Sequence, residues 1–528
     1  MNLYCKGMLS FFHRLRDVFG LQFILYLVVS QLLLKGMCMR LSMGMMLPLL
    51  KSMGVDATQF QIYMSVAMVP WTFKPVVGLC SDLLTLKQYK KKWWIILALA
   101  SGLVGAGLLF GAYTVRSVPW LVACFVLLQF AISVTDLLTE GKYSELMRDN
   151  PKSGSDIITF VNGLQTGGSI VAMTFMGPMA DKALWYPILG ILFVLMAGPL
   201  VPTLLGWLPE KKIEMHGACI NIDKERWQND KQRFMVVGLA GLAGPLVAIA
   251  ASLVHTAWLP LVMAFAMLCV ILVLTRKTFP RVVFMVATYQ VIAFVSKPSM
   301  GGALDYFYTA DEQCVLSGPH FDWAYYLTYT GLVGAMVGFA AVWLYQLWLS
   351  TWKFRNVLTF TTILVGCGGI MDLMIVLRLN RNWFHIPDKW FYLFGEAVLE
   401  TVVSMLYWIP SSAIIAKVVP EGMESSCFAL MAGLSNFARM FSDLSGAAIF
   451  HLAGVKTTPI EGGYCRFDNM WMLVFLFHII SPIAIGVPAT LLVPNCKQTD
   501  VISPEGEILN QEAIELEAFD EWSWSEEG

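Results

Sequence analysis

The chain carries little charge for its length. Of its 528 residues 14% are charged and 57% are hydrophobic, and the mean hydropathy is +0.64. This composition lies outside the range of soluble globular domains. The sequence also lacks a glycine-rich phosphate-binding loop, a nucleophile with an adjacent base, and metal-ligand spacing. These absences argue against an ATP-driven pump, an enzyme, a metal site and a nucleic-acid partner, and we expect an integral membrane protein without a cofactor.

Three further absences concern the ends of the chain and its faces. Residues 1–19 mix charges into short apolar pieces, so we predict no cleavable signal peptide and a cytoplasmic N-terminal segment. No N-glycosylation sequon occurs that could identify an outer face. Residues 500–528 contain neither Lys nor Arg and are rich in Asp and Glu. Such a composition predicts a solvated cytoplasmic tail.

Apolar stretches long enough to cross a bilayer as helices recur fourteen times between residues 20 and 493. Strands of a membrane barrel would alternate over about ten residues, a pattern that these stretches do not follow. Lys and Arg are most frequent in the loops after even-numbered stretches, which predicts that both termini are cytoplasmic. We expect the protein in the plasma membrane. The expected organisation is an N-terminal segment (1–19), a six-helix half (20–208), a cytoplasmic linker (209–233), two additional helices (234–275), a second six-helix half (281–493) and an acidic tail (494–528).

Charged residues inside the apolar stretches fall on corresponding helices of the two halves. A charge at membrane depth costs several kcal/mol unless it faces protein or water, so these helices should surround an aqueous cavity. Two parallel six-helix repeats around such a cavity form the major facilitator architecture, an all-α bundle. Asp372, on a third helix, is the exception to the pattern. The charges lie on the first helices (Lys35, Arg40; Lys297, Asp305), the fourth helices (Asp136, Glu140; Glu396, Glu400), a second helix (Lys74) and a fifth helix (Arg439).

The segment from Gly78 to Asp82, followed by a lysine cluster at 87–92, resembles the loop motif of the major facilitator superfamily. The resemblance implies that Gly78 allows close helix packing and that Asp82 helps to hold an inner gate shut. The lysines lie further from Asp82 than in the superfamily pattern, and the excess of cations in cytoplasmic loops accounts for them equally well.

A longer set of motifs resembles the folate-biopterin transporter family, above all its kinetoplastid members. These motifs are Lys35-Gly36, MMLPLL (45–50), KPVVGLCSD (74–82), EGKYSELMR (140–148) and GSDIITFVNG (154–163). The resemblance covers about residues 20 to 493 and implies proton-linked uptake of pterins or folates. Some members of that family carry other substrates such as S-adenosylmethionine, so the resemblance leaves the ligand open.

The intramembrane charges suit this chemistry. A pterin ring has a donor edge that a carboxylate can accept in paired hydrogen bonds, and folate adds carboxylates that cations bind. The acids of each pair on a fourth helix are spaced i, i+4 and share one helix face. Internal salt bridges with Lys35, Lys74 or Lys297 are the alternative role for these acids. We expect substrate contacts from Lys35, Arg40, Lys74, Asp136, Lys297, Asp305 and Arg439, and proton coupling by Glu140, Glu396 and Glu400.

Cys314 and Cys465 lie in polar loops expected on the outer face, where oxidation is possible. We predict a disulfide between them, with two free thiols as the alternative. Two other functions also stay open: a carrier of S-adenosylmethionine or a nucleoside-like compound, and a transporter-like receptor that binds a metabolite and signals through the acidic tail.

Overall fold

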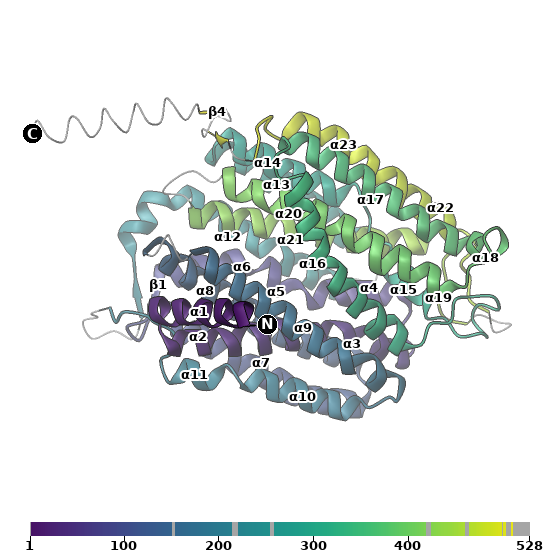
Figure 1. The fold of residues 1–528 in the computed structure, drawn as a ribbon, viewed down its shortest axis with the longest axis horizontal. Helices are drawn as coiled ribbons and strands as arrows, with labels where there is room; N and C mark the ends of the chain where they lie inside the picture. The colour runs from purple at the N-terminus through teal and green to yellow at the C-terminus, as the bar shows by residue number, and fades with distance from the viewer. Residues whose placement is uncertain are drawn as a thin grey trace, which may run out of the picture.

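The computed structural model describes residues 2–149, 154–213, 220–253, 258–418, 424–459, 464–498, 500–502 and 508–509. The described chain forms two bundles of roughly parallel helices that lie against each other (Figure 1). The earlier helices occupy the lower part of that view and the later, green to yellow helices occupy the upper part.

The first bundle and its flanking elements comprise α1 (Asn2–Phe19), α2 (Leu21–Leu27), η1 (Val28–Cys38, π-helical), α3 (Met39–Ser52), α4 (Ala57–Ala67), α5 (Val69–Thr72), α6 (Lys74–Leu83), β1 (Leu84–Leu86), α7 (Lys92–Val115), α8 (Val118–Asp149), α9 (Gly154–Asp181), α10 (Trp185–Ala197) and α11 (Leu200–Leu204). Then come β2 (Ile220–Ile222), α12 (Lys224–Leu253) and α13 (Trp258–Thr278).

The second bundle comprises α14 (Arg281–Val295), α15 (Gly301–Tyr308), η3 (Ala324–Tyr329), α16 (Thr330–Trp348), α17 (Phe354–Val376), α18 (Leu379–Asn382), α19 (Asp388–Tyr392), η4 (Leu393–Glu400), α20 (Thr401–Val418), α21 (Glu424–Leu452), α22 (Met470–Val474), η5 (Phe475–Ile480) and α23 (Ser481–Leu492). The short strands β3 (Val501–Ile502) and β4 (Ile508–Leu509) follow.

Within the described residues, ten helices are long and apolar enough to cross a membrane. The other four expected stretches are helical too, but two of them are interrupted. The stretch at 58–83 is divided into α4, α5 and α6, and the stretch at 281–308 is divided between α14 and α15. Proline explains both breaks, because Pro70, Pro75 and Pro298 lie at the divisions and cannot donate a helical hydrogen bond.

Two segments expected as a plain terminus and a plain linker contain regular structure. Residues 2–19 form the helix α1, which ends before Gly20 at a positive φ of 81°. In the linker, β2 pairs antiparallel with β1, and α12 begins at Lys224, ten residues before the apolar stretch. The linker is therefore attached to the loop that follows α6.

The additional helices α12 and α13 lie beside the seam between the bundles. α12 contacts α5 and α6 of the first half and α21 of the second. Its glycines allow a very close approach to the first half: a Cβ on Gly244 would collide with the side chain of Thr72, and one on Gly241 would lie 2.9 Å from the nitrogen of Val76. Glycine is needed at these two positions for that contact.

Hydrogen bonds between the two halves gather at the end of the molecule where α3 and α15 end. The ammonium of Lys51 donates to the carbonyl of Thr309 (2.6 Å), and the hydroxyl of Tyr306 donates to the carbonyl of Val55 (2.5 Å). Asp181, at the end of α9, accepts from the backbone nitrogens at the start of η3. The halves are joined at this end, which the distribution of Lys and Arg predicts to be the outer one.

Candidate functional site

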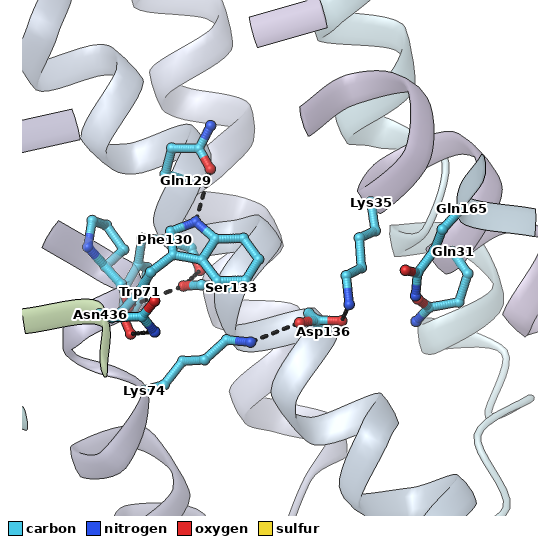
Figure 2. A network of polar contacts seen from close by, with 11 residues as sticks. Gln31, Lys35, Trp71, Lys74, Gln129, Phe130, Ser133, Asp136, Gln165 and Asn436 are labelled. Carbon is cyan, nitrogen blue, oxygen red and sulfur yellow. Dashed lines mark hydrogen bonds and ion pairs between the residues drawn. The ribbon is translucent and has the colours of Figure 1, made fainter. Parts of the chain in front are cut away.

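An ion triad lies inside the first half (Figure 2). The carboxylate of Asp136, on α8, is 2.5 Å from the ammonium of Lys35 on η1 and 2.7 Å from that of Lys74 at the start of α6. The Asp136 side chain is only 3% exposed. Glu140 lies one helical turn further along α8 and interacts with the same two lysines. Two cations and two carboxylates therefore balance. Asp136 forms the salt bridges that the sequence left open as the alternative to a substrate contact, and they lie within the first half.

The triad is held by polar contacts on both sides. The ammonium of Lys74 lies 4.3 Å from the ring centre of Trp71, whose indole nitrogen donates to Gln129. The amide of Asn436, from α21 of the second half, donates to the carbonyl of Trp71 at 3.1 Å. The orientation of Lys74 is thus connected to the seam between the halves.

Glycines bring the backbone of η1 against α9 next to Lys35. A Cβ on Gly36 would lie 2.7 Å from the carbonyl oxygen of Gln165, and one on Gly168 would collide with the carbonyl of Leu32. Gln165 also donates to Gln31 at 2.8 Å. The Lys35-Gly36 pair therefore does not break the helix, and its glycine instead allows close packing.

The second half contains a cavity of about 110 Å³. Its lining residues are all from the second half, although the sequence predicts a cavity shared by both halves. α17 contributes to the cavity wall because it packs closely against η5. A Cβ on Gly369 of α17 would collide with the carbonyl of His478 on η5, so the two backbones are in direct contact. The lining residues are Lys297, Gly301, Leu304, Asp305, Tyr308, Tyr326, Val365, Gly369, Asp372, Tyr392, Glu396, Glu400 and His478.

Four carboxylates face this cavity, and two of them, Asp305 and Asp372, accept hydrogen bonds from tyrosine hydroxyls. Asp305 accepts from the hydroxyl of Tyr326 at 2.5 Å. Asp372 accepts from the hydroxyl of Tyr308 at 2.7 Å and lies 2.9 Å from the imidazole of His478. These contacts explain how Asp372 is tolerated on a third helix.

The other two carboxylates lie on the fourth helix of the half. Glu400 accepts from the hydroxyl of Ser404 at 3.1 Å, and Glu396 lies one turn before it. Lys297, in the break between α14 and α15, is the lysine that lines the cavity. The hydroxyl of Ser442 donates a hydrogen bond to the carbonyl of Lys297 (2.5 Å), which holds the break between α14 and α15 in place. The cavity wall thus has more potential negative than positive charge.

Aromatic rings form one wall of the cavity. Tyr392 packs edge-on against Tyr308 with ring centres 4.8 Å apart, and lies 5.8 Å from Tyr326. Flat apolar surfaces beside hydrogen-bonding groups are suited to a planar heteroaromatic ligand.

The remaining predicted residues lie away from the triad and the cavity. Arg40 is exposed and lies beside Gly331 on α16, and Arg439 is exposed and lies 5.3 Å from the ring centre of Phe294. Gly78 has only ordinary contact with Leu137, and Asp82 lies in the last turn of α6, next to β1.

Sequence reasoning missed several cavity residues. Asp372 is visible as a charge out of pattern, whereas His478 and the tyrosines have no signal that separates them from other residues of apolar helices. Across the described chain, no three His, Cys, Asp or Glu side chains are grouped so as to hold a metal ion.

The predicted disulfide is present. Cys314 and Cys465 are bonded, with 4.7 Å between their Cα atoms, and the nitrogen of Cys465 donates to the carbonyl of Cys314. The bond connects the loop after α15 to the loop before α22, so it joins these two loops of the second half.

Solved transporters share this fold. The peptide transporter PepTSo of the POT family superimposes with a TM-score of 0.65 at 13% identity, covering 89% of this chain and 98% of the other. A D-xylose-proton symporter gives a TM-score of 0.56 at 12% identity, covering 93% and 100%. At such identities the likeness concerns the fold alone, and it confirms the expected major facilitator architecture.

Sequence relatives carry the family assignment. A probable folate-biopterin transporter 6 of Arabidopsis thaliana is 22% identical, covering 85% of this chain and 78% of the relative. A folate-biopterin transporter of Synechocystis is 23% identical, covering 81% and 73%. The model of the BT1 family matches residues 35–513, which confirms the resemblance drawn from the sequence motifs and the expectation of a transporter rather than an enzyme. The chain is an integral membrane protein that belongs to the BT1 family of membrane transporters.

Proposed function

We propose that this protein carries pterins or folates across the membrane by alternating access, driven by a proton gradient. The observation that carries the proposal is the cavity in the second half, where four carboxylates and one lysine lie beside an aromatic wall. The printed names of the relatives, folate-biopterin transporters, support the substrate class.

The aromatic wall and the acids together suit a pterin. The planar ring would stack against a tyrosine such as Tyr392, and its amidine-like edge would donate to a carboxylate such as Asp305 or Glu396. The glutamate tail of a folate would need cations. Lys297 in the cavity, and Arg40 and Arg439 as exposed cations, are the candidates for that contact.

The excess of carboxylates supports a role for protons. Ionised carboxylates are costly at membrane depth unless each has a cation or several donors. The cavity is lined by four acids but by only two basic side chains, Lys297 and His478. Uptake of a proton by one acid therefore relieves the repulsion among the carboxylates. Substrate binding at the same acids would then be coupled to their protonation.

Alternating access is supported by the position of the cross-bundle hydrogen bonds. They gather at the end where α3 and α15 terminate, which corresponds to a carrier closed at its outer face. A carrier of this kind reopens that face by moving one half against the other. The orientation of both termini toward the cytoplasm is part of the proposal.

The test is uptake by the purified full chain in liposomes with an imposed pH gradient. Labelled biopterin and folate are each supplied outside an alkaline interior. We expect accumulation that collapses when an ionophore removes the gradient and that each unlabelled compound inhibits. Accumulation unaffected by the ionophore would reject proton coupling, and no uptake of either compound would reject the substrate class.

A carrier of S-adenosylmethionine is the second candidate, because the acid-rich cavity also suits a sulfonium cation. The same liposomes distinguish the two. Accumulation of labelled S-adenosylmethionine without accumulation of biopterin or folate would favour the second candidate over the first.

A further inference from the structure

A second hollow lies on the outside of the molecule, between α13 and α14. It has a volume of about 490 Å³ and shares no lining residue with the cavity of the second half. Its lining residues are Leu272, Val273, Arg276, Lys277, Phe284 and Thr288. The two helices are connected by the short turn at Phe279 and Pro280, so the hollow lies at the closed end of a helical hairpin.

The hollow has an apolar floor and a cationic rim. Arg276 and Lys277, in the last turn of α13, are both exposed. The guanidinium of Arg276 lies 5.8 Å from the ring centre of Phe284. In the described part of the chain neither residue forms an ion pair with a carboxylate. The segment 276–281 contains three cations and no acid, which leaves their charge available to a ligand.

The position along α13 matches the boundary of a bilayer. α13 is one of the ten helices that can span a membrane, and only 28% of its most apolar stretch is buried inside the protein. Its exposed residues, such as Val262, Phe265 and Val273, would face lipid in a bilayer. Its cationic last turn then lies at the level of the phosphate groups, where Lys and Arg at helix ends are stabilised.

We propose that this groove binds one anionic phospholipid, with the phosphate and headgroup at Arg276 and Lys277 and an acyl chain along Val273 and Phe284. An arginine can hold two phosphate oxygens with its planar fork, and a lysine adds a second charge. Basic pockets between membrane helices are suited to acidic headgroups. A zwitterionic headgroup brings its own cation next to the two side chains, so charge complementarity selects an anionic lipid.

The groove is placed to influence transport because α14 leads into the break at Lys297. A bound lipid would fill the space between α14 and α13, and α13 is attached to α12 beside the seam between the halves. The lipid would therefore contact the helix that leads to the cavity residue Lys297 without contacting the cavity itself.

The test measures lipid binding to the full detergent-solubilised chain by native mass spectrometry. Dioleoyl phosphatidylglycerol and dioleoyl phosphatidylcholine are titrated separately. We expect tighter binding of phosphatidylglycerol, and a loss of about thirtyfold in that preference for Arg276→Gln with Lys277→Gln, since each of the two charges near the headgroups contributes about 1 kcal/mol. Arg276→Lys keeps the charge and should keep most of the preference.

Two controls separate this site from general charge effects. Lys211→Gln with Lys212→Gln removes two exposed cations outside the groove and should leave the preference unchanged. Val273→Trp fills the groove and should weaken binding of both lipids. Excess inorganic phosphate should not displace the lipid.

Three results would overturn the proposal. One is a preference that is equal in the parent and in the Arg276→Gln, Lys277→Gln variant. Another is displacement of the lipid by inorganic phosphate, which would indicate a site for free phosphate. The third is a preference that emerges only after residues 510–528 are removed, which would assign the groove to the acidic tail.

Discussion

Asp181 and Trp323 belong to different halves, yet the carboxylate of Asp181 accepts a hydrogen bond from the backbone nitrogen of Trp323 at 2.8 Å. Its second oxygen accepts from the nitrogen of Ala324 at 2.9 Å. A carboxylate in this position satisfies free donors at the start of a helix. One half therefore supplies the N-terminal cap of a helix in the other, and the proposed alternating access requires this contact to break when that end opens.

Loss of this cap should favour the open arrangement of that end. Asp181→Ala removes a contact of about 1 kcal/mol, which should increase the open population about fivefold. Double electron–electron resonance between spin labels attached at positions 182 and 316 measures the change as a larger fraction of long label-to-label distances. Asp468→Ala, which alters an exposed ion pair within the second half, is the matched control. Identical distance distributions in both variants would mean that Asp181 does not stabilise the closed end.

The triad around Asp136 should be important for folding. Asp136→Asn leaves the ammonium groups of Lys35 and Lys74 inside the protein without their carboxylate, and breaking a buried pair in this way costs about 3 to 5 kcal/mol. We expect a clear fall in the thermal midpoint of the detergent-solubilised protein. Adding Lys35→Met to Asp136→Asn should recover part of that loss, because one ammonium, Lys74, then balances the one remaining carboxylate, Glu140.

Asp17→Asn provides the comparison for that experiment. Its ion pair with Arg16 has side chains that are 62% and 51% exposed, and such pairs contribute little to stability. An Asp136→Asn variant as stable as Asp17→Asn would show that the triad does not stabilise the fold.

Lys35 and Lys297, the lysines on the first helix of each half, should both be needed for transport. Lys35→Ala and Lys297→Ala are each expected to abolish uptake of biopterin and folate while the protein still reaches the membrane. Lys297→Arg keeps the charge in the cavity and should retain measurable uptake. Transport at the parental rate in both alanine variants would remove Lys35 and Lys297 from the substrate path.

Glu396 is the candidate proton carrier. Glu396→Gln should weaken the dependence of accumulation on external pH while exchange of substrate across the membrane persists, because an amide cannot take up the proton. Glu312→Gln changes an exposed glutamate outside the cavity and should behave like the parent. Uptake that still rises at acidic pH in Glu396→Gln would transfer the role to Asp136, Glu140 or Glu400.

The disulfide can be tested by mass spectrometry of the unreduced protein. We expect a linked peptide containing Cys314 and Cys465, and a loss of about 2 to 4 kcal/mol in stability for Cys465→Ser because the bond limits the unfolded chain. Cys269→Ser, at an exposed free thiol, is the control. Full recovery of both cysteines as free alkylated peptides would contradict the bond and the placement of these loops outside.

The sequence predicts the fold well because membrane helices have a strong local signal. Length, hydropathy and the distribution of Lys and Arg need no knowledge of tertiary contacts, and intramembrane charges such as Lys35 and Asp136 are conspicuous. The disulfide could be predicted for a similar reason, since Cys314 and Cys465 lie in polar loops that the expected topology places on one face.

The partners of those charges could not be predicted in the same way. Asp136 had lysines of both halves as candidates, and only the close contact of η1 with α9 and the break before α6 place Lys35 and Lys74 beside it. The cavity depends on tyrosines such as Tyr308, whose function arises from packing between helices. A tyrosine in an apolar stretch is typical of any membrane helix, so its sequence context does not identify it.

The close fit of α12 against the first half affects how a rocking motion can occur. Gly241 and Gly244 let the backbone of α12 lie directly against Val76 of α6 and Thr72 of α5. α12 also packs against α21, and there side chains of both helices, such as Val237 and Phe437, are buried in the same core cluster. Such close contact fixes the position of one helix along its neighbour, whereas a layer of side chains between two helices allows them to slide past each other. α12 should therefore move together with the first half. The movement between the halves would then take place where α12 meets α21.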